Sequence, residues 1–242
     1  MNRKLKIALY ILLAAAAVAG VIWANVARLN SPVRELNVEL EYPNGDTLVT
    51  ADEIANLVQD QMPHLMTQLV KEVDESRVQA IAETSPYLCQ CDVAVSVGRD
   101  IVIRAHQRRP IALVFDGKAQ YYIDTTGIHM PVSTHSDPDI IIASGEIAGS
   151  ATAFEYVRRM ANFLYEHQEY SPLFDQIYID KHRDIYLTPK LGKHVVLVGD
   201  TTDLDTKISN LMAFYQRGMK KTGWDTYSMI ILKYHGQVIG RK

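Results

Sequence analysis

The side chains able to do chemistry in this chain are scattered, and no group of them has the spacing of a recognised active site. The eight histidines include no His-Glu-x-x-His pair, so the spacing that lets one helix face hold zinc is missing. Neither Gly-x-Ser-x-Gly nor Ser-x-x-Lys occurs, which removes two serine-nucleophile signatures. No glycine-rich phosphate loop is present. We therefore predict a protein that is not an enzyme, with no metal site, no cofactor and no small-molecule substrate.

Two cysteines, Cys89 and Cys91, are separated by one residue. If both lie on one strand, their side chains point the same way with the Cα atoms ~6.5–7 Å apart. That separation is at the outer limit for a disulfide. Two free thiols, buried or half-buried, are the simpler interpretation, and a strained disulfide in an oxidising compartment is the alternative. A zinc site would require further ligands in recognisable pairs.

Composition and charge describe an ordinary folded protein. Hydrophobic residues make up 48% of the 242 residues and charged residues 22%. The formal net charge is −3. Domains that bind nucleic acid are usually basic, with clustered Lys and Arg. We therefore expect no nucleic-acid partner.

The first thirty residues predict a membrane anchor. Residues 7–27 carry no charge and are numerous enough to cross a hydrocarbon core of ~30 Å as a helix. Arg3, Lys4 and Lys6 precede them, which favours a short cytoplasmic tail at residues 1–6. The alternative is a cleaved signal peptide ending at Ala17-Val18-Ala19, although the apolar run continues past it. Either interpretation exports the rest of the chain.

Residues 33–110 predict a small module with the order strand, helix, helix, strand, strand. Alternation of apolar and polar residues over 33–41 indicates a half-buried strand. A turn is expected at residues 43–46, and Thr50 and Glu53 then have the spacing of a capping box. A second helix is expected from Asp74. Alternating valines over 93–97 and isoleucines from 101 indicate two paired strands.

Residues 111–242 predict a larger domain of short strands and two helices. Asp116-Gly117 separates two apolar runs, which is a hairpin signal. Thr152 and Glu155 have capping-box spacing, as do Thr202 and Asp205 more weakly, and Gly218 or Gly223 is expected to end the second helix. The last strands are expected at residues 227–234 and 237–239. The fold class is therefore α+β: a transmembrane helix, the small β-α-α-β-β module, and a mixed, mainly antiparallel β domain.

Several segments share their order and spacing with one known family. Residues 108–110 are Arg-Arg-Pro at the start of the second domain, and residues 122–127 are Tyr-Ile-Asp-x-x-Gly. Residues 194–199 form a strand ahead of the last helix, and residues 230–236 form a strand ending in Tyr-His-Gly. With the anchor, this arrangement resembles the cell-division family FtsQ, called DivIB in Gram-positive bacteria, in its Bacteroidota version. Gln107, Ile231 and Lys233 depart from the family pattern.

The resemblance implies a POTRA domain at residues 33–110 and an FtsQ-type β domain at residues 111–242. It further implies a non-enzymatic division scaffold in the cell inner membrane, with its C-terminal domain in the periplasm at the division septum. Family members bind FtsB-like and FtsL-like divisome proteins and help to recruit septal peptidoglycan synthesis.

The resemblance also places a partner site at the last strand, where an unpaired sheet edge accepts an added strand. Tyr234 is the expected aromatic anchor, and Gly236 is expected to permit a sharp turn or a close backbone approach. Lys233 and Arg241 are expected to complement an acidic partner segment. The predicted site consists of Lys233, Tyr234, Gly236, Gln237, Val238, Ile239 and Arg241.

Two other functions remain open from the sequence. One is an anchored POTRA protein of a secretion or envelope-assembly system, although such proteins usually continue into a transmembrane barrel. The other is an anchored hydrolase of the cell wall, for which Asp124 and Glu146 are a candidate carboxylate pair if the fold brings them near one another.

Overall fold

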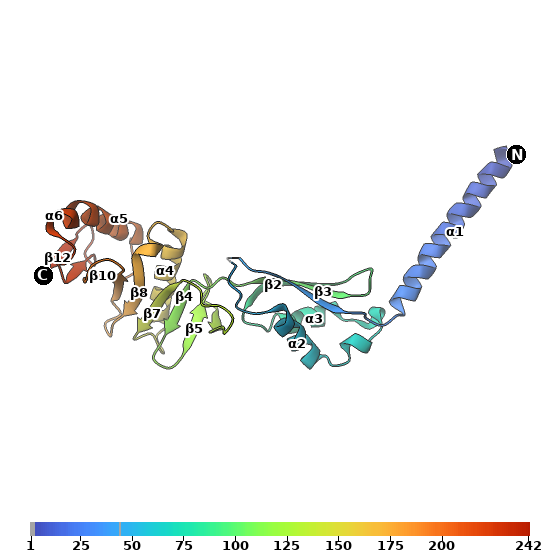
Figure 1. Cartoon of the computed structure of the whole chain (residues 1–242), viewed down its shortest axis with the longest axis horizontal. Coiled ribbons are helices and arrows are strands. Elements are labelled where there is room, and N and C mark those ends of the chain that lie inside the picture. The colour runs from blue at the N-terminus through green and yellow to red at the C-terminus, as the bar shows by residue number, and fades with distance from the viewer. Residues whose placement is uncertain (1–2, 44) are drawn as a thin grey trace. The chain divides into compact units, whose positions relative to one another are not determined.

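The computed structural model describes residues 3–43 and 45–242, and its chain divides into two compact units, Met1–Gln107 and Arg108–Lys242 (Figure 1). Residues 1 and 2 of the predicted tail and residue 44 of the predicted turn lie outside the described residues. Each unit has a hydrophobic core of its own. The two units are described separately below.

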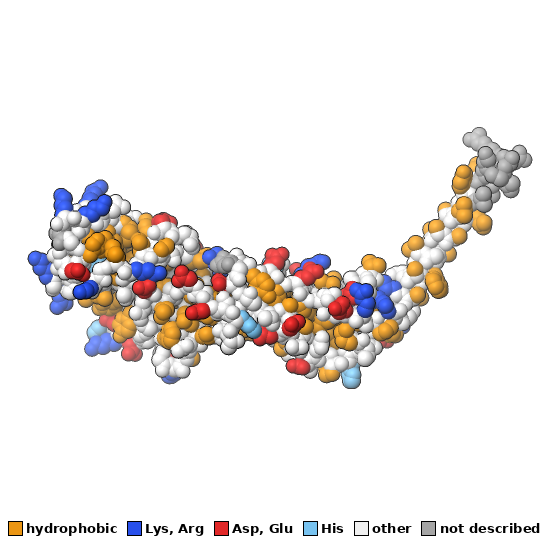
Figure 2. Space-filling view, in the orientation of Figure 1, with side chains coloured by type: hydrophobic (Ala, Val, Ile, Leu, Met, Phe, Trp, Pro, Cys, Tyr) orange, Lys and Arg blue, Asp and Glu red, His pale blue; other side chains and the backbone are white. Residues whose placement is uncertain are grey.

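The N-terminal helix α1 (Arg3–Leu29) contains the predicted apolar segment. Residues Tyr10–Leu29 have a mean hydropathy of 2.0, and none of that window is buried against the rest of the protein. Figure 2 shows hydrophobic side chains along the described part of this helix. The helix is long and apolar enough to cross a membrane, which is compatible with a single-pass anchor.

The rest of the first unit has the predicted order of elements. Strands β1 (Leu36–Glu41), β2 (Leu88–Val95) and β3 (Ile101–Gln107) form a sheet in the order β1-β3-β2, with β1 parallel and β2 antiparallel to β3. Helices α2 (Ala51–Gln61) and α3 (Glu75–Ala82) lie between β1 and β2 in the chain, with two short 3₁₀ turns between them. The predicted capping box of Thr50 and Glu53 is confirmed. Ile54, Val58 and Val78 pack with Ile101 and Ile103 in the core.

Gln107, one of the departures from the family pattern, has a structural role. Its Oε1 accepts hydrogen bonds from the backbone N–H groups of Leu48 at 2.7 Å and Val49 at 3.3 Å, and its Nε2 donates to the Asp46 carbonyl at 2.8 Å. The side chain is buried, and an amide can both donate and accept, whereas a carboxylate only accepts. Gln107 therefore provides hydrogen-bond partners for the backbone groups of the loop that precedes α2.

Both cysteines are free thiols, as predicted, but the prediction that both are at least half-buried is wrong for Cys89. A β-bulge between Leu88 and Gln90 breaks the regular alternation, so Cys89 is exposed while Cys91 is buried. Burial, with smaller contributions from Glu83 and Asp92, raises the pKa of Cys91 to about 11. Cys91 is therefore a protonated core residue at neutral pH.

The second unit contains a nine-stranded sheet with the order β12-β11-β10-β9-β8-β7-β4-β5-β6. Five neighbouring pairs are antiparallel and three are parallel, namely β4–β7, β7–β8 and β10–β11. The predicted mixed, mainly antiparallel domain is confirmed. The strands are β4 (Ala112–Phe115), β5 (Gln120–Ile123), β6 (His129–Pro131), β7 (Ile141–Gly145), β8 (Phe174–Ile179), β9 (Ile185–Pro189), β10 (Val195–Gly199), β11 (Met229–Ile231) and β12 (Ile239–Arg241).

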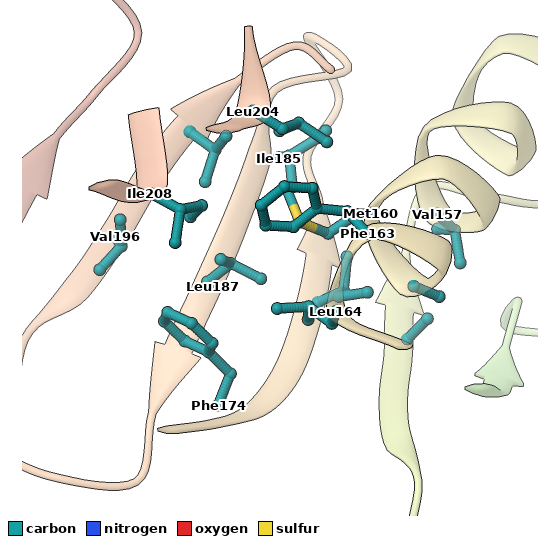
Figure 3. Packing of buried hydrophobic residues seen from close by; sticks show 14 of the residues in the cluster. Val157, Met160, Phe163, Leu164, Phe174, Ile185, Leu187, Val196, Leu204 and Ile208 are labelled. Atoms are coloured by element: carbon teal, nitrogen blue, oxygen red, sulfur yellow. The ribbon is translucent and has the colours of Figure 1, made fainter. Parts of the chain in front are cut away.

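Helices α4 (Ala151–Glu166) and α5 (Leu204–Phe214) pack on one face of this sheet. Figure 3 shows side chains of both helices, among them Met160, Leu164 and Ile208, turned toward Leu187 and Val196 of the strands. All five are buried. At about 1.5–3 kcal/mol for each buried aliphatic side chain, this layer is a major source of the domain's stability.

The predicted caps of these two helices are wrong. Ser150, not Thr152, is the N-cap of α4 and accepts a hydrogen bond from Ala153 N–H. Glu155 instead pairs with Arg158 and Arg159, which lowers its pKa to about 2. For α5 the N-cap is Asp203, in a left-handed conformation with no side-chain cap.

The chain after α5 winds into a π-helix at Tyr215–Met219 and a last turn, α6 (Lys220–Thr222). It ends at Gly223, whose φ is +89°. Of the two glycines proposed as the end of this helix, Gly223 is the one that ends it.

Candidate functional site

Strand β12 lies at one end of the nine-stranded sheet. Its neighbour is β11, which it meets in antiparallel register with Ile239 opposite Ile231 and Arg241 opposite Met229. Beyond β12 the sheet order contains no further strand among the described residues. This strand is therefore an edge, as the site prediction requires.

The hydrogen bonds of β11 determine which backbone groups of β12 point outward. The Ser228 carbonyl accepts from Val195 N–H, and Leu232 N–H donates to the Leu197 carbonyl, so Ile230, which lies between these two groups, turns both its N–H and its C=O toward β10. Residues 229 and 231 then face β12, since successive residues of a strand alternate in direction. The backbone groups of their partners, Arg241 and Ile239, point toward β11. The Arg241 carbonyl accepts a hydrogen bond from Ser228 N–H at 2.8 Å. The N–H and C=O of Gly240, between them, point toward the open edge.

Gly240 is also required by packing. A Cβ at this position would lie 2.5 Å from Cε1 and 2.6 Å from Cδ1 of the Tyr227 ring. That ring contacts Phe214, with 5.6 Å between the ring centroids. The aromatic ring therefore covers the glycine on the helix side of the sheet, and Ile239 and Arg241 project from the other side.

The two last strands differ from the prediction: β11 is shorter than the expected 227–234, and β12 has the expected length but begins two residues later than expected. Tyr234, Gly236 and Gln237 lie in the connection between β11 and β12. The connection turns at Gly236, whose φ is +68°, and Gln237 N–H donates to the Tyr234 carbonyl at 3.1 Å. No atom lies within 4 Å of a Cβ at Gly236, so this glycine serves the turn and not a close approach. The Tyr234 side chain is 56% exposed.

Val238 and Ile239 differ in their surroundings. Val238 immediately precedes β12, is half-buried and packs against the core of the domain. Ile239, the first residue of β12, is 40% exposed on the side away from the helices. Val238 fixes the start of the edge, while Ile239 presents an apolar side chain beside it.

The two predicted cations are not equivalent. Lys233 Nζ lies 2.7 Å from an Asp184 carboxylate oxygen, and this hydrogen bond raises the pKa of Lys233. Arg241 is exposed and has no ion pair among the described residues. The charge of Arg241 therefore remains available to an acidic partner, whereas that of Lys233 is already matched.

Positive charge is concentrated in the last quarter of the chain. Residues 181–242 contain eleven Lys and Arg against five Asp and Glu, although the whole chain has a net charge of −3. Residues 30–107 show the opposite balance, with five basic and thirteen acidic side chains. Figure 2 shows Lys and Arg side chains gathered where Figure 1 places α6 and β12. The open edge thus lies in a basic part of the domain.

A buried aromatic cluster supports the strands behind this edge. His194, just before β10, bonds through Nε2 to the Tyr215 hydroxyl at 2.7 Å, and Trp224 contacts both rings. Burial lowers the pKa of His194, and its Nδ1 atom is buried without a hydrogen-bond partner. The neutral imidazole is therefore the form that fits the folded domain.

The other end of the sheet holds two of the four motifs that suggested the family, at residues 108–110 and 122–127. Arg108 donates to Asp124 Oδ2 at 2.7 Å, and Asp124 Oδ1 accepts from Thr126 and from Ile128 N–H. Burial acts to raise the pKa of Asp124, but these hydrogen bonds and the guanidinium outweigh it and hold the pKa below its usual value. Arg109 lies over the Tyr165 ring at 4.6 Å. These motif residues organise the start of the domain.

The described residues show no group of three or more His, Cys, Asp or Glu placed to hold a metal ion. A small cavity of about 80 Å³ lies against the connection between β11 and β12, lined in part by Asp203, Lys207 and Tyr234. Asp124, one half of the candidate carboxylate pair, is committed to Arg108 and its own turn. Asp124 therefore has a structural role at the start of the domain.

Sequence reasoning missed two residues of this edge, Gly240 and Tyr227. A glycine inside a strand pattern indicates a close approach of another group, so Gly240 carried a usable signal. The partner ring lies thirteen residues earlier, and no local pattern connects the two positions.

Comparison with known proteins places this geometry in a family. The family model described as FtsQ/DivIB, C-terminal related, matches residues 109–241, which is more than half of the chain. No curated protein matches the chain as a relative. The matched segment contains the nine-stranded sheet and its open edge.

Proposed function

The chain belongs to the FtsQ/DivIB C-terminal-related family, and from that membership we propose that it is a single-pass scaffold of the cell-division machinery. The family is one of non-enzymatic division proteins. The proposed partners are FtsB-like and FtsL-like divisome proteins, which the scaffold links to septal peptidoglycan synthesis. In this proposal the protein has no catalytic activity and needs no cofactor.

The proposed arrangement assigns each segment a role. Residues 1–6 are a cytoplasmic tail, residues 7–27 span the inner membrane, residues 33–110 form a POTRA-like domain and residues 111–242 form the partner-binding β domain. The length and apolar character of α1 and the strand-helix-helix-strand-strand order of the first unit support it. The two folded domains would then lie in the periplasm at the septum.

One observation carries the proposal: β12 ends the sheet with the Gly240 N–H and C=O pointing outward. An extended partner segment can pair with these groups, and backbone hydrogen bonds then supply affinity that does not depend on side chains. Tyr234, Ile239 and Arg241 lie close in sequence to this edge and supply aromatic, apolar and cationic contacts for selecting the partner. Tyr and Arg are enriched among the residues that dominate interface energies.

The direct test is Val238→Pro in the full-length protein. By the same alternation as Gly240, the Val238 N–H points toward the open edge, and proline has no N–H to donate. We expect the variant to lose co-purification with FtsB-like and FtsL-like partners from solubilised membranes. Val238→Thr is the matched control, because it keeps both the β-branched shape and the N–H and is expected to bind.

Circular dichroism and the thermal midpoint of both variants show whether the domain stays folded. Normal co-purification by a folded Val238→Pro protein would remove the edge from the proposal. Midcell localisation of a fluorescent fusion tests the wider claim, since a uniform envelope signal would contradict a division role.

A further inference from the structure

The turn between β2 and β3 has an apolar residue at its apex. Val97 is 86% exposed, which is the largest fraction for any large hydrophobic side chain among the described residues, those of α1 included. Tight turns usually place Gly, Asn, Asp, Pro or Ser at such positions, because these residues suit the backbone of a turn. Here the left-handed conformation belongs to Arg99, whose φ is +73° and whose N–H donates to the Ser96 carbonyl at 3.1 Å. The backbone of the turn therefore does not account for a valine at its apex.

This turn is bonded to the chain that leaves α1. Arg28, in the last turn of α1, donates from Nη1 to the Ser96 carbonyl at 2.9 Å. Arg34 donates from Nε and Nη2 to the two carboxylate oxygens of Asp100, each at 2.7 Å. Figure 1 shows the turned end of the β2–β3 hairpin beside the end of α1. Val97 directly follows Ser96, with about 3.8 Å between their Cα atoms, so it lies next to whatever surrounds the end of α1.

Cations without ion pairs lie at the same end of α1. Lys71 Nζ donates at 2.7 Å to the side-chain oxygen of Asn30, the residue that directly follows α1, and Arg99 lies in the turn itself. In the described part of the chain neither of these two cations nor Arg28 has an ion pair. An apolar side chain flanked by Lys and Arg is typical of segments that lie at a membrane surface.

Two carboxylates beside the turn are already bonded within the protein. Asp100 pairs with Arg34, and Glu75 Oε1 accepts a hydrogen bond from Val95 N–H at 3.0 Å. Neither carboxylate forms an ion pair with Arg99, so the positive charge of the turn remains available.

We propose that the β2–β3 turn is a second membrane contact, in which Val97 enters the lipid headgroup region and the cations around it bind lipid phosphates. This contact rests on the proposed function, because a membrane-spanning α1 is needed to put Arg28 at the headgroup level. Arg28 directly follows the uncharged residues 7–27, and cations at the ends of membrane helices lie at that level. One N–H of Arg28 bonds to the Ser96 carbonyl, and a guanidinium has further donors for a phosphate. Beyond anchoring, the contact fixes which end of the first folded module faces the membrane.

A lipid surface suits this turn better than a protein partner does. A specific protein interface buries about 800 Å² on each partner, whereas the turn offers a single exposed valine between cations. Lipids require no complementary shape. Because α1 already tethers the turn to the membrane, a weak contact is enough to hold it there.

The test is fluorescence quenching in the full-length protein, reconstituted in vesicles of phosphatidylethanolamine and phosphatidylglycerol. A fraction of the lipid carries a nitroxide on the upper acyl chain, which quenches nearby fluorophores. Val97→Cys carries the fluorophore NBD in a Cys89→Ser background, since Cys89 is exposed and Cys91 is buried. Asp52→Cys is the matched control, because Asp52 is exposed near the opposite end of β3, at Gln107. We expect the fluorescence at position 97 to be quenched and the fluorescence at position 52 to remain.

A third label separates this proposal from the anchor on which it rests. Val18→Cys places the fluorophore inside α1, where we expect quenching in every sample if the helix spans the membrane. No quenching at position 18 would contradict the anchor and with it the proposed single-pass scaffold. Quenching at position 18 without quenching at position 97 would overturn the membrane contact of the turn and leave the anchor intact.

Removal of one charge tests the role of the cations. Arg99→Gln keeps the backbone hydrogen bonds of the turn, and we expect the ratio of quenched to unquenched label at position 97 to fall about fivefold at an unchanged thermal midpoint. Arg104→Gln is the control, because Arg104 lies within β3 and pairs with Glu39, and it should leave the quenching unchanged. Equal quenching with and without the Arg99→Gln substitution would overturn the phosphate contact.

Discussion

The two edge strands of the nine-stranded sheet, β6 and β12, differ in the backbone N–H and C=O groups that they leave unpaired. At β6, Asp124 N–H donates to the Ile128 carbonyl, so the residues turned outward are His129 and Pro131. Pro131 has no N–H to offer an incoming strand. At β12, the outward residue is Gly240, which offers both an N–H and a C=O. Pro131 therefore makes the β6 end less favourable for strand addition than the β12 end; we call the β6 end the closed end and the β12 end the open end.

Side chains reinforce this difference. Near β6 the His129 ring stacks on Tyr121 at 4.2 Å and contacts Phe154 at 5.0 Å, and Asp124 holds Arg108 in a buried pair. Near β12 the side chains are exposed and the unpaired charges are cationic. Two of the family motifs, at residues 108–110 and 122–127, therefore maintain the closed end, while the motif at residues 230–236 leads into the open end, which carries the features of a binding surface.

The largest effect is expected at the closed end, from Asp124→Asn. The asparagine amide would point N–H groups either at the Arg108 guanidinium or at the N–H groups of Thr126 and Ile128. Breaking a buried pair of this kind costs about 3 kcal/mol. Denaturant unfolding should show that loss, and an unchanged free energy of unfolding would contradict a structural role for the motif.

A smaller loss of stability with a larger loss of binding is expected from Gly240→Val at the open end. Its side chain must displace the Tyr227 ring, at an overpacking cost of about 2 kcal/mol, and β12 moves with it. Gly236→Ala is the control: its positive φ costs about 1 kcal/mol, but no atom obstructs the new methyl group. Titration with the partner should show weaker binding for Gly240→Val than for Gly236→Ala. Equal affinities of the two variants would show that β12 is not part of the interface.

Acidification is expected to destabilise the buried cluster around His194, which lies behind the open end. Burial lowers the pKa of His194, so the unfolded chain takes up a proton at a higher pH than the folded domain does. Stability is then present above about pH 6.5, the usual histidine value, and is lost as the pH falls below it. In the His194→Gln variant the thermal midpoint should fall less between pH 7 and pH 5 than it does in the wild-type protein. An equal fall in both proteins would show that His194 is not the cause of the pH dependence.

The smallest effects compare the two cations of the open end. Lys233→Ala breaks an exposed pair with Asp184, worth at most about 1 kcal/mol in stability. Arg241→Ala breaks no ion pair within the described residues, so stability should not change. Partner affinity should nevertheless fall more for Arg241→Ala, because only its charge is unmatched. Calorimetry that gave the reverse order would restore Lys233 as the principal cation.

Local patterns in the sequence predicted local structure only in part. The capping box of Thr50 and Glu53 is complete within four residues, and the structure contains it as predicted. The same pattern misled at Thr152, because Ser150 lies in the extended conformation that an N-cap needs and Glu155 is used by two arginines. Which residue caps a helix depends on competition between neighbouring polar side chains, and the spacing of residues in the sequence carries no information about that competition.

The edge strand was predictable in approximate position, and the partner site on it stays a prediction. Alternation and glycine placement located the last two strands and the turn at Gly236, yet β11 ends at Ile231 and β12 begins at Ile239, so the connection between them is longer than expected. The outward direction of Gly240 depends on β10 bonding to β11, which are separated by two helices and a π-helix in the chain. Contacts of that sequence separation leave no periodic signal.

Residue-resolved amide hydrogen exchange, with and without an FtsB-like partner, tests the open edge most directly. Ile239 and Arg241 already face β11, so partner binding should change their exchange little. We expect binding to slow exchange at Val238 and Gly240, the two amides that point outward. Protection at the closed end near β6, or no slowing at Val238 and Gly240, would contradict strand addition at β12.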